Sequence, residues 1–223
     1  MSRVEVADLA VSVALGALAG LCVLTLCVLG DGGPLFTDAG LHAWSVTHRP
    51  GVVLLPARCL TATGTGPVPY ALAALAGVVA ARTVRLRLAA AGLAVLCLAS
   101  GQAVRYGVMT VVARARPPRA DWGTHASGWS FPSGHATTAT LTAGLLVLAI
   151  CLREPRGRTL LATATGCWGA LTGLSRVFLG VHWFTDVVGG WLLGLAWLAL
   201  WVCGLARWLP DRLPGRLVSP TGG

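Results

Sequence analysis

Residues 7–29 read ADLAVSVALGALAGLCVLTLCVL, an apolar run that holds one charged side chain, Asp8. A helix of about 20 apolar residues is long enough to cross the roughly 30 Å hydrocarbon core of a bilayer. The run is longer than the apolar core of a signal peptide, and the residues after it form no clear cleavage site. The sequence therefore predicts a retained membrane span at its N-terminal end.

Similar runs continue along the chain, which is 55% hydrophobic and only 11% charged, against about 25% charged in soluble domains. We expect an all-α polytopic membrane protein whose residues 1–223 form one six-helix bundle. Residues 31–66 are mixed, and we expect a loop there with a short interfacial helix around Asp38–Val46. The six expected spans are 7–29, 67–82, 88–112, 133–152, 160–179 and 184–206.

All 17 basic residues are arginines, and the formal net charge is +9. They lie between apolar runs and form no single basic face, which excludes nucleic acid as a partner. Arginines favour cytoplasmic loops. With a cytoplasmic N-terminus, the cytoplasmic segments hold Arg3, Arg82, Arg85, Arg87, Arg153, Arg156, Arg158, Arg207, Arg212 and Arg216. The other side then holds Arg49, Arg58, Arg105, Arg114, Arg116, Arg119 and Arg176.

Most of the remaining polar residues fall into three clusters, and the six-span topology places all three on the non-cytoplasmic side. The first is Arg105 with Arg114-Ala115-Arg116-Pro117, the second is 131–135 (FPSGH), and the third is 175–186 (SRVFLGVHWFTD). Their common side predicts one shared site.

The residue types in these clusters suit phosphate chemistry. Arginines offer planar donors to phosphate oxygens, and a helix that starts at Ser133-Gly134 presents free N–H groups to an anion. His182 and Asp186 are four residues apart on one helix, so the carboxylate can hold one imidazole nitrogen and free the other. His135 can then protonate a leaving oxygen.

With these residues in place, the chain resembles the type 2 phosphatidic acid phosphatase (PAP2) superfamily, whose motifs are K-x6-R-P, P-S-G-H and S-R-x5-H-x3-D. The second motif is complete at 132–135, and the third is complete as Ser175-Arg176, His182 and Asp186. The first is present as Arg116-Pro117, but Met109 occupies the lysine position.

The resemblance implies a role for each matching residue. His182 would be the nucleophile and would pass through a phosphohistidine. Asp186 would orient it, and His135 would be the general acid. The family requires no metal and no cofactor. The phosphate oxygens would be held by Arg116, Arg176, Ser133 and the N–H of Gly134.

Met109 leaves one phosphate contact without a cation. Arg105 lies four residues earlier, on the same helix face. Our hypothesis is that Arg105 or Arg114 compensates; the competing view is a weakened site or one adapted to another substrate.

The leading prediction is a phosphatase for a lipid phosphate or polyprenyl diphosphate in a bacterial plasma membrane, with its active site outside and membrane lipids around it. A phosphotransferase needs the same residues and stays open, as does a non-catalytic lipid-phosphate binding protein. Soluble vanadate-dependent haloperoxidases share the phosphate-site residues, but six apolar spans argue against them.

Overall fold

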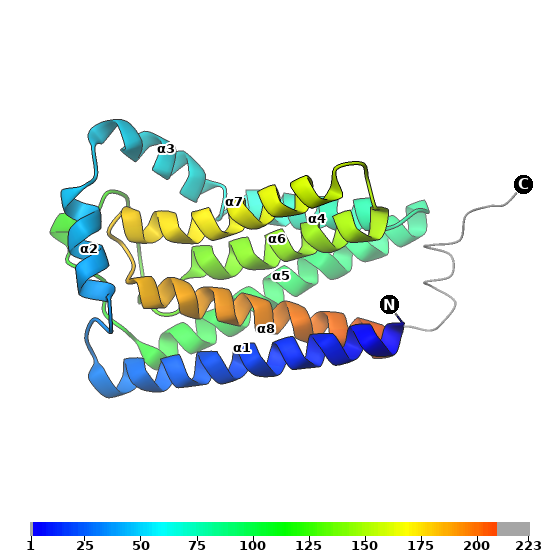
Figure 1. Ribbon diagram of the computed structural model, residues 1–223, viewed down its shortest axis with the longest axis horizontal. Coiled ribbons are helices and arrows are strands. Elements are labelled where there is room, and N and C mark those ends of the chain that lie inside the picture. The colour runs from blue at the N-terminus through cyan, green and yellow to red at the C-terminus, as the bar shows by residue number, and fades with distance from the viewer. Residues whose placement is uncertain (1, 209–223) are drawn as a thin grey trace, which may run out of the picture.

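The structure is a computed structural model that describes residues 2–208. Within these residues every regular element is a helix. The long helices run side by side along one axis, while α2 lies across one end of the bundle (Figure 1). The elements are α1 (Arg3–Asp31), α2 (Asp38–Thr47), α3 (Gly51–Ala62), α4 (Pro67–Ala80), α5 (Val84–Val112), the 3-10 helix η1 (Arg119–Asp121), α6 (Gly134–Arg153), α7 (Arg158–Phe178) and α8 (Phe184–Trp208).

The first helix has clear start and stop signals. Ser2 and Glu5 form a capping box, in which each side chain accepts from the backbone N–H of the other residue. Gly32 ends α1 with a positive φ of 65°, and its N–H bonds to the carbonyl of Val28. These caps satisfy backbone groups that the helix itself cannot pair.

The bundle is held together by helix pairs both near and distant in sequence: α1 packs along α8, and α6 lies against both its neighbour α7 and α8. Two glycines of α8 face α6. A Cβ added to Gly190 would lie 2.7 Å from the carbonyl oxygen of Ser133, and one added to Gly194 would lie 2.8 Å from Thr140. The missing side chains therefore let α8 approach the start of α6 closely.

The count of six membrane spans is not confirmed. Four helices of the described chain, α1, α5, α6 and α8, are long and apolar enough to cross a membrane. The pair α3 and α4, bent by 52°, gives a fifth if it is counted as one broken span. The helix α7 has 21 residues, but its charged ends and polar residues reduce its hydropathy. The arginines Arg212 and Arg216, used in the charge comparison, lie outside the described residues.

The segment 31–66 differs most from expectation. The short helix at Asp38 is confirmed as α2, but the residues expected to form a loop after it contain α3. The helix α3 includes Pro56, which removes one N–H and is a strong signal against a helix interior. The expected span at 67–82 is also shorter in the structure. The helix α4 begins at Pro67 as expected, after the positive φ of Gly66, but it ends at Ala80.

Candidate active site

The C-terminal ends of α5 and α7 and the N-terminal ends of α6 and α8 lie toward the end of the bundle where α2 lies (Figure 1). A loop connects α5 to α6, and the turn from α7 to α8 lies beside it. The N–H of Ser133 donates to the carbonyl of Asp186 at 2.9 Å, and an Arg116 N–H donates to the carbonyl of Val181 at 2.7 Å. These bonds bring the three polar clusters together.

His182 and Asp186 form a buried pair at the start of α8. The imidazole Nδ1 lies 3.4 Å from Asp186 Oδ2, and neither residue is more than 2% exposed. The same carboxylate oxygen accepts from the Trp183 N–H at 2.8 Å and from the Ser130 hydroxyl. Several donors therefore fix the carboxylate that faces the imidazole.

The other imidazole nitrogen faces an arginine. Arg116 Nη1 lies 2.9 Å from His182 Nε2. Because a guanidinium can only donate, Nε2 must be the acceptor, which leaves the ring proton on Nδ1 toward Asp186. Burial lowers the pKa of His182 to about 4; Arg116 and Arg176 also lower it, and Asp186 opposes them. The imidazole is therefore neutral at pH 7, with its lone pair on Nε2.

Arg116 is itself held by the backbone around it. Its Nε donates to the carbonyl of Gly128 and its Nη2 to those of Ser127 and Trp129, each at 2.9 Å. Its Nη1 is shared between Val181 and His182. Burial lowers the pKa of Arg116 to about 10, so the residue keeps its charge at neutral pH. An anion bound beside Nε2 of His182 would accept the hydrogen bond that Arg116 now donates to Nε2.

Polar atoms without partners lie at the start of α6 and on the neighbouring helices α5 and α7. In residues 2–208, Ser133 Oγ, Arg105 Nε and Arg176 Nε are buried and make no hydrogen bond. Buried polar groups in proteins are almost always paired, so unpaired donors in one region indicate a place for a ligand. These three atoms belong to residues that the sequence assigns to phosphate binding.

Arg105 lies directly against the PSGH segment. A Cβ added to Gly134 would lie 3.0 Å from Arg105 Nη2 and 3.1 Å from its Cζ. The arginine Nη1 also lies 2.9 Å from the sulfur of Met109, the residue at the position of the family's lysine. Arg105 lies one turn of α5 before Met109, and its guanidinium therefore reaches the place where the motif lacks a cation.

His135 lies in the first turn of α6 and is partly buried. It lies within electrostatic range of Arg176, His182, Arg116 and Arg105. His135 therefore lies near His182, the residue with which the sequence predicts that it acts.

Arg114 differs from the other arginines. Its Nη1 donates to Thr185 Oγ1 and Asp186 Oδ1, both at 2.7 Å. Its Nη2 donates to the carbonyl of Gly33 and to Asp38 Oδ2, both at 2.9 Å. A phosphate contact from either terminal nitrogen would require one of these bonds to break.

Sequence reasoning did not identify Ser130 or Asp38 as part of this region. Ser130 stands two residues before Pro132, and that proximity was the available signal. No comparable signal in the sequence pointed to Asp38, because its partners Arg114 and Thr185 are 76 and 147 residues away.

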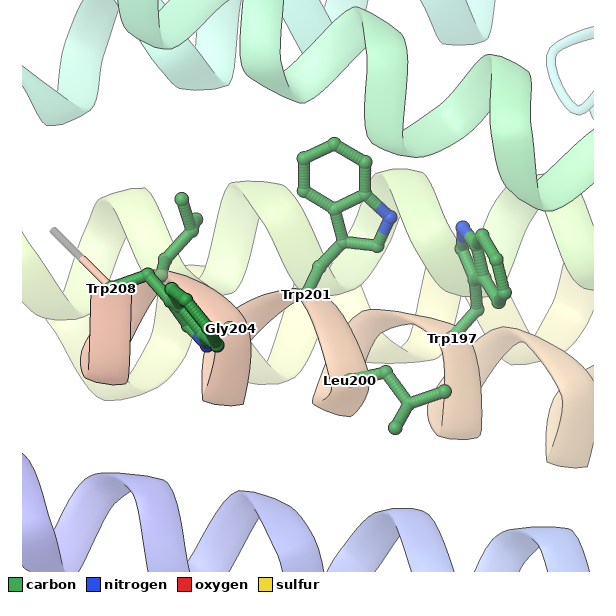
Figure 2. Close-up of a pocket in the computed structure, with 6 residues that line it drawn as sticks. Trp197, Leu200, Trp201, Gly204 and Trp208 are labelled. Atoms are coloured by element: carbon green, nitrogen blue, oxygen red, sulfur yellow. The ribbon is translucent and has the colours of Figure 1, made fainter.

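Two surface cavities differ in chemistry. One, of about 660 Å³, adjoins the site and is lined by residues of α4, α5 and α6 that include Tyr70, Gln102, Arg105, Tyr106 and Thr138. The other, of about 440 Å³, lies along the C-terminal half of α8, where Figure 2 shows Trp197, Trp201 and Trp208. The cavity along α8 has an apolar lining. Of the two cavities, the one lined by Arg105 is therefore the one that adjoins the polar site.

Fold and site together define a helical bundle with helices of membrane-spanning length and a cluster of arginines beside a carboxylate-held histidine. The family model that matches the chain is that of the PAP2 superfamily, over residues 88–209. Since this match covers more than half of the chain, the protein belongs to the PAP2 superfamily.

Curated relatives match parts of the chain. Phosphatidylglycerophosphatase B of Bacillus subtilis is 37% identical over 87 residues, 38% of this chain and 42% of the relative. An undecaprenyl-diphosphatase of Sulfolobus acidocaldarius is 38% identical over 71 residues, 32% of this chain and 31% of the relative. A lipid A 1-phosphatase of Rhizobium etli is 35% identical over 118 residues, 46% of this chain and 47% of the relative. The matches therefore span less than half of each relative.

A solved structure shares the fold over almost the whole chain. It is the crystal structure of a transmembrane PAP2-type phosphatidylglycerolphosphate phosphatase from Bacillus subtilis. The TM-score is 0.73 at 22% sequence identity, and the match covers 89% of this chain and 98% of that one.

Proposed function

We propose that this protein is a metal-independent membrane phosphatase that removes a phosphate from a lipid phosphate or polyprenyl diphosphate. The observation that carries the proposal is the lone pair of His182 Nε2, which faces Arg116 while Asp186 holds the opposite nitrogen. Membership of the PAP2 superfamily and the phosphatase names of the relatives support it.

The reaction proceeds in two displacements. In the first, Nε2 of His182 attacks phosphorus, the bond to the leaving oxygen breaks, and His135 gives that oxygen a proton. In the second, water attacks the phosphohistidine and passes a proton to His135. The P–N bond breaks, and inorganic phosphate leaves with the imidazole lone pair restored.

Arginines stabilise the charge that develops on the phosphoryl oxygens. We assign this role to Arg105, Arg116 and Arg176, together with the Ser133 hydroxyl and the N–H of Gly134. The unpaired donors of Arg105, Arg176 and Ser133 support the assignment. Both terminal nitrogens of Arg114 are paired with buried carboxylates, those of Asp186 and Asp38, and we assign it to Asp186 instead.

We further propose that α7 is a sixth span, because it packs along α6 and its 21 residues extend about 31 Å. The arginine distribution supports a location of the site on the outer face of a bacterial plasma membrane. A lipid substrate would reach it by lateral diffusion, and the cavity beside Arg105 would take the part of the lipid next to its phosphate.

The test is phosphate release by the purified protein in detergent, with EDTA present. The substrates are a polyprenyl diphosphate, phosphatidylglycerol phosphate and phosphatidic acid. We expect release by the wild type and a loss of about a thousandfold or more in His182→Ala. The matched control is His125→Ala, since His125 is exposed in the loop before α6.

Three outcomes would reject the proposal or part of it. Release that survives His182→Ala rejects the nucleophile, and release abolished by EDTA rejects metal independence. Transfer of phosphate to an added alcohol, without release to water, would establish the phosphotransferase instead.

A further inference from the structure

A chain of buried charges extends behind the proposed nucleophile. His182 faces Asp186, Asp186 Oδ1 accepts from Arg114 at 2.7 Å, and Arg114 donates to Asp38 at 2.9 Å. The side chains of Arg114, Asp38 and Asp186 are at most 2% exposed. The last member, Asp38, comes from α2, a helix that carries none of the family's motif residues.

Asp38 is fixed by four donors. Its Oδ1 accepts from the Thr185 N–H at 2.9 Å. Its Oδ2 accepts from the Thr185 hydroxyl at 2.6 Å, the Leu35 N–H at 3.0 Å and Arg114 at 2.9 Å. Thr185 directly precedes Asp186, so Asp38 holds both the backbone beside Asp186 and the arginine bonded to it.

The charges in this chain alternate in sign. A lone Arg114 on Oδ1 of Asp186 would draw electron density from the carboxylate and weaken its hold on His182 at Oδ2. Water screens little of this effect, because all three charged groups are buried. A second carboxylate on the far side of Arg114 offsets that charge and leaves Asp186 able to accept strongly from the imidazole.

We propose that Asp38 is a positioning residue for the His182–Asp186 pair, which it supports by orienting Arg114 and offsetting its charge. This proposal rests on the proposed function. The hydrogen bonds of Asp38 go to Leu35, Arg114 and Thr185 and not to His182, so we expect its effect on the chemical step and not on phosphate binding.

Other charged groups face His182 and remain in place in the test. They are Asp186 on α8, Arg116 in the loop before α6, Arg176 on α7 and His135 on α6. A change measured on removal of the Asp38 charge alone therefore reports the path through Arg114.

The experiment compares Asp38→Asn with Asp121→Asn. Asp121 also contacts α2, through His42 at 3.0 Å, and its side chain is 32% exposed. We expect Asp38→Asn to lower kcat about tenfold with KM changed less than about twofold, and Asp121→Asn to change neither. A rise in KM at unchanged kcat would overturn the proposal, as would equal losses in the two variants.

The double variant Asp38→Asn/Arg114→Gln separates charge from shape. It removes both charges, so we expect its kcat to exceed that of Asp38→Asn. If Asp38→Asn fails to fold but the double variant folds, the uncompensated arginine is the cause, which supports the proposal. A double variant that is no more active than Asp38→Asn, or that also fails to fold, overturns it.

A readout without turnover keeps this inference distinct from the proposed function. In protein labelled with ¹⁵N-histidine, we expect the His182 Nδ1–H proton to move upfield in Asp38→Asn, because its bond to Asp186 weakens. His182→Ala assigns the signal, and Asp121→Asn should leave it unmoved. An unchanged signal overturns the role of Asp38 whether or not the wild type releases phosphate, whereas a shifted signal without phosphate release rejects only the proposed function.

Discussion

At the scale of single residues, the replacement of a motif lysine by Met109 defines one position of the site. Met109 is 5% exposed, and its sulfur lies against Arg105 Nη1. Arg105 thus occupies space on the PSGH segment that a cation from position 109 would otherwise approach. The sequence suggested this from a spacing of four residues, and the structure adds the contact with Gly134.

A cation swap tests this arrangement. We expect Arg105→Ala to lower kcat/KM at least about tenfold, because a charge facing phosphate is lost. The double variant Arg105→Ala/Met109→Lys should recover part of that loss, since the lysine restores a cation one turn away. Steady-state phosphate release measures both, with Arg85→Ala, exposed in the first turn of α5, as the control. Unchanged turnover in Arg105→Ala would show that Arg105 does not compensate.

We expect the protonation of His182 to set the acid limit of activity. Its pKa is lowered to about 4, chiefly by burial, so the lone pair on Nε2 persists at any pH above that value. We expect kcat/KM to stay high between about pH 5 and 7 and to fall as the pH drops through about 4. A pH–rate profile with a fixed substrate checks this, with His182→Ala giving the background. An acid limb near pH 6.5 would contradict a buried, neutral His182.

The motif residues could be predicted because each motif is local in sequence. His182 and Asp186 are one helical turn apart, so their spacing alone predicts that they meet. Asp38 and Ser130 could not be found in this way. Their contacts with Asp186 and Arg114 depend on how α2 and the loop before α6 pack against α8, and no fixed spacing encodes that packing.

At the scale of helices, the close approach of α6 and α8 places Ser133 beside Asp186. Gly190 is the contact point, with the Ser133 carbonyl and the Ala136 Cβ each 2.7 Å from an added Cβ. Because one of these neighbours is backbone, the clash cannot be relieved by a side-chain rotation. A substitution that moves α6 away from α8 therefore also moves the PSGH segment away from His182 and Asp186.

Two glycine substitutions in α8 test this packing. We expect Gly190→Ala to destabilise the protein by about 1–3 kcal/mol and to reduce activity. Gly204→Ala is the matched control, since nothing lies within 4 Å of its added Cβ. The control should gain up to about 1 kcal/mol from helix propensity. Thermal unfolding in detergent measures both; equal melting temperatures would contradict a tight α6–α8 contact.

Helix positions were predictable where apolar runs were long and uninterrupted. The expected span at 184–206 corresponds to α8 at Phe184–Trp208, which begins at the same residue and ends two residues later. The segment with α3 was not predictable in this way, because Pro56 and the glycines at 64 and 66 read as loop signals. Packing of α3 against α7 overrides those local signals.

At the scale of the whole molecule, the bundle has two chemically different ends. The end with α2 holds the arginines that are bonded to carboxylates, carbonyls and His182. The loop between α6 and α7 at the other end carries Arg153, Arg156 and Arg158, which are exposed. Arginines held in a site act less as topology signals, so the exposed arginines where α6 ends and α7 begins support a cytoplasmic location for that end.

Cysteine labelling in intact cells tests this orientation. In a chain freed of its seven cysteines, Ala120→Cys places a thiol in the loop before α6, and Arg156→Cys places one in the α6–α7 loop. Both positions are exposed, so a difference in labelling between them reports the membrane and not burial of the thiol. We expect a membrane-impermeant maleimide to label Ala120→Cys alone, and both variants once the cells are permeabilised. The reverse pattern would place the proposed site in the cytoplasm, where an outward-facing lipid phosphate could not reach it without first crossing the bilayer.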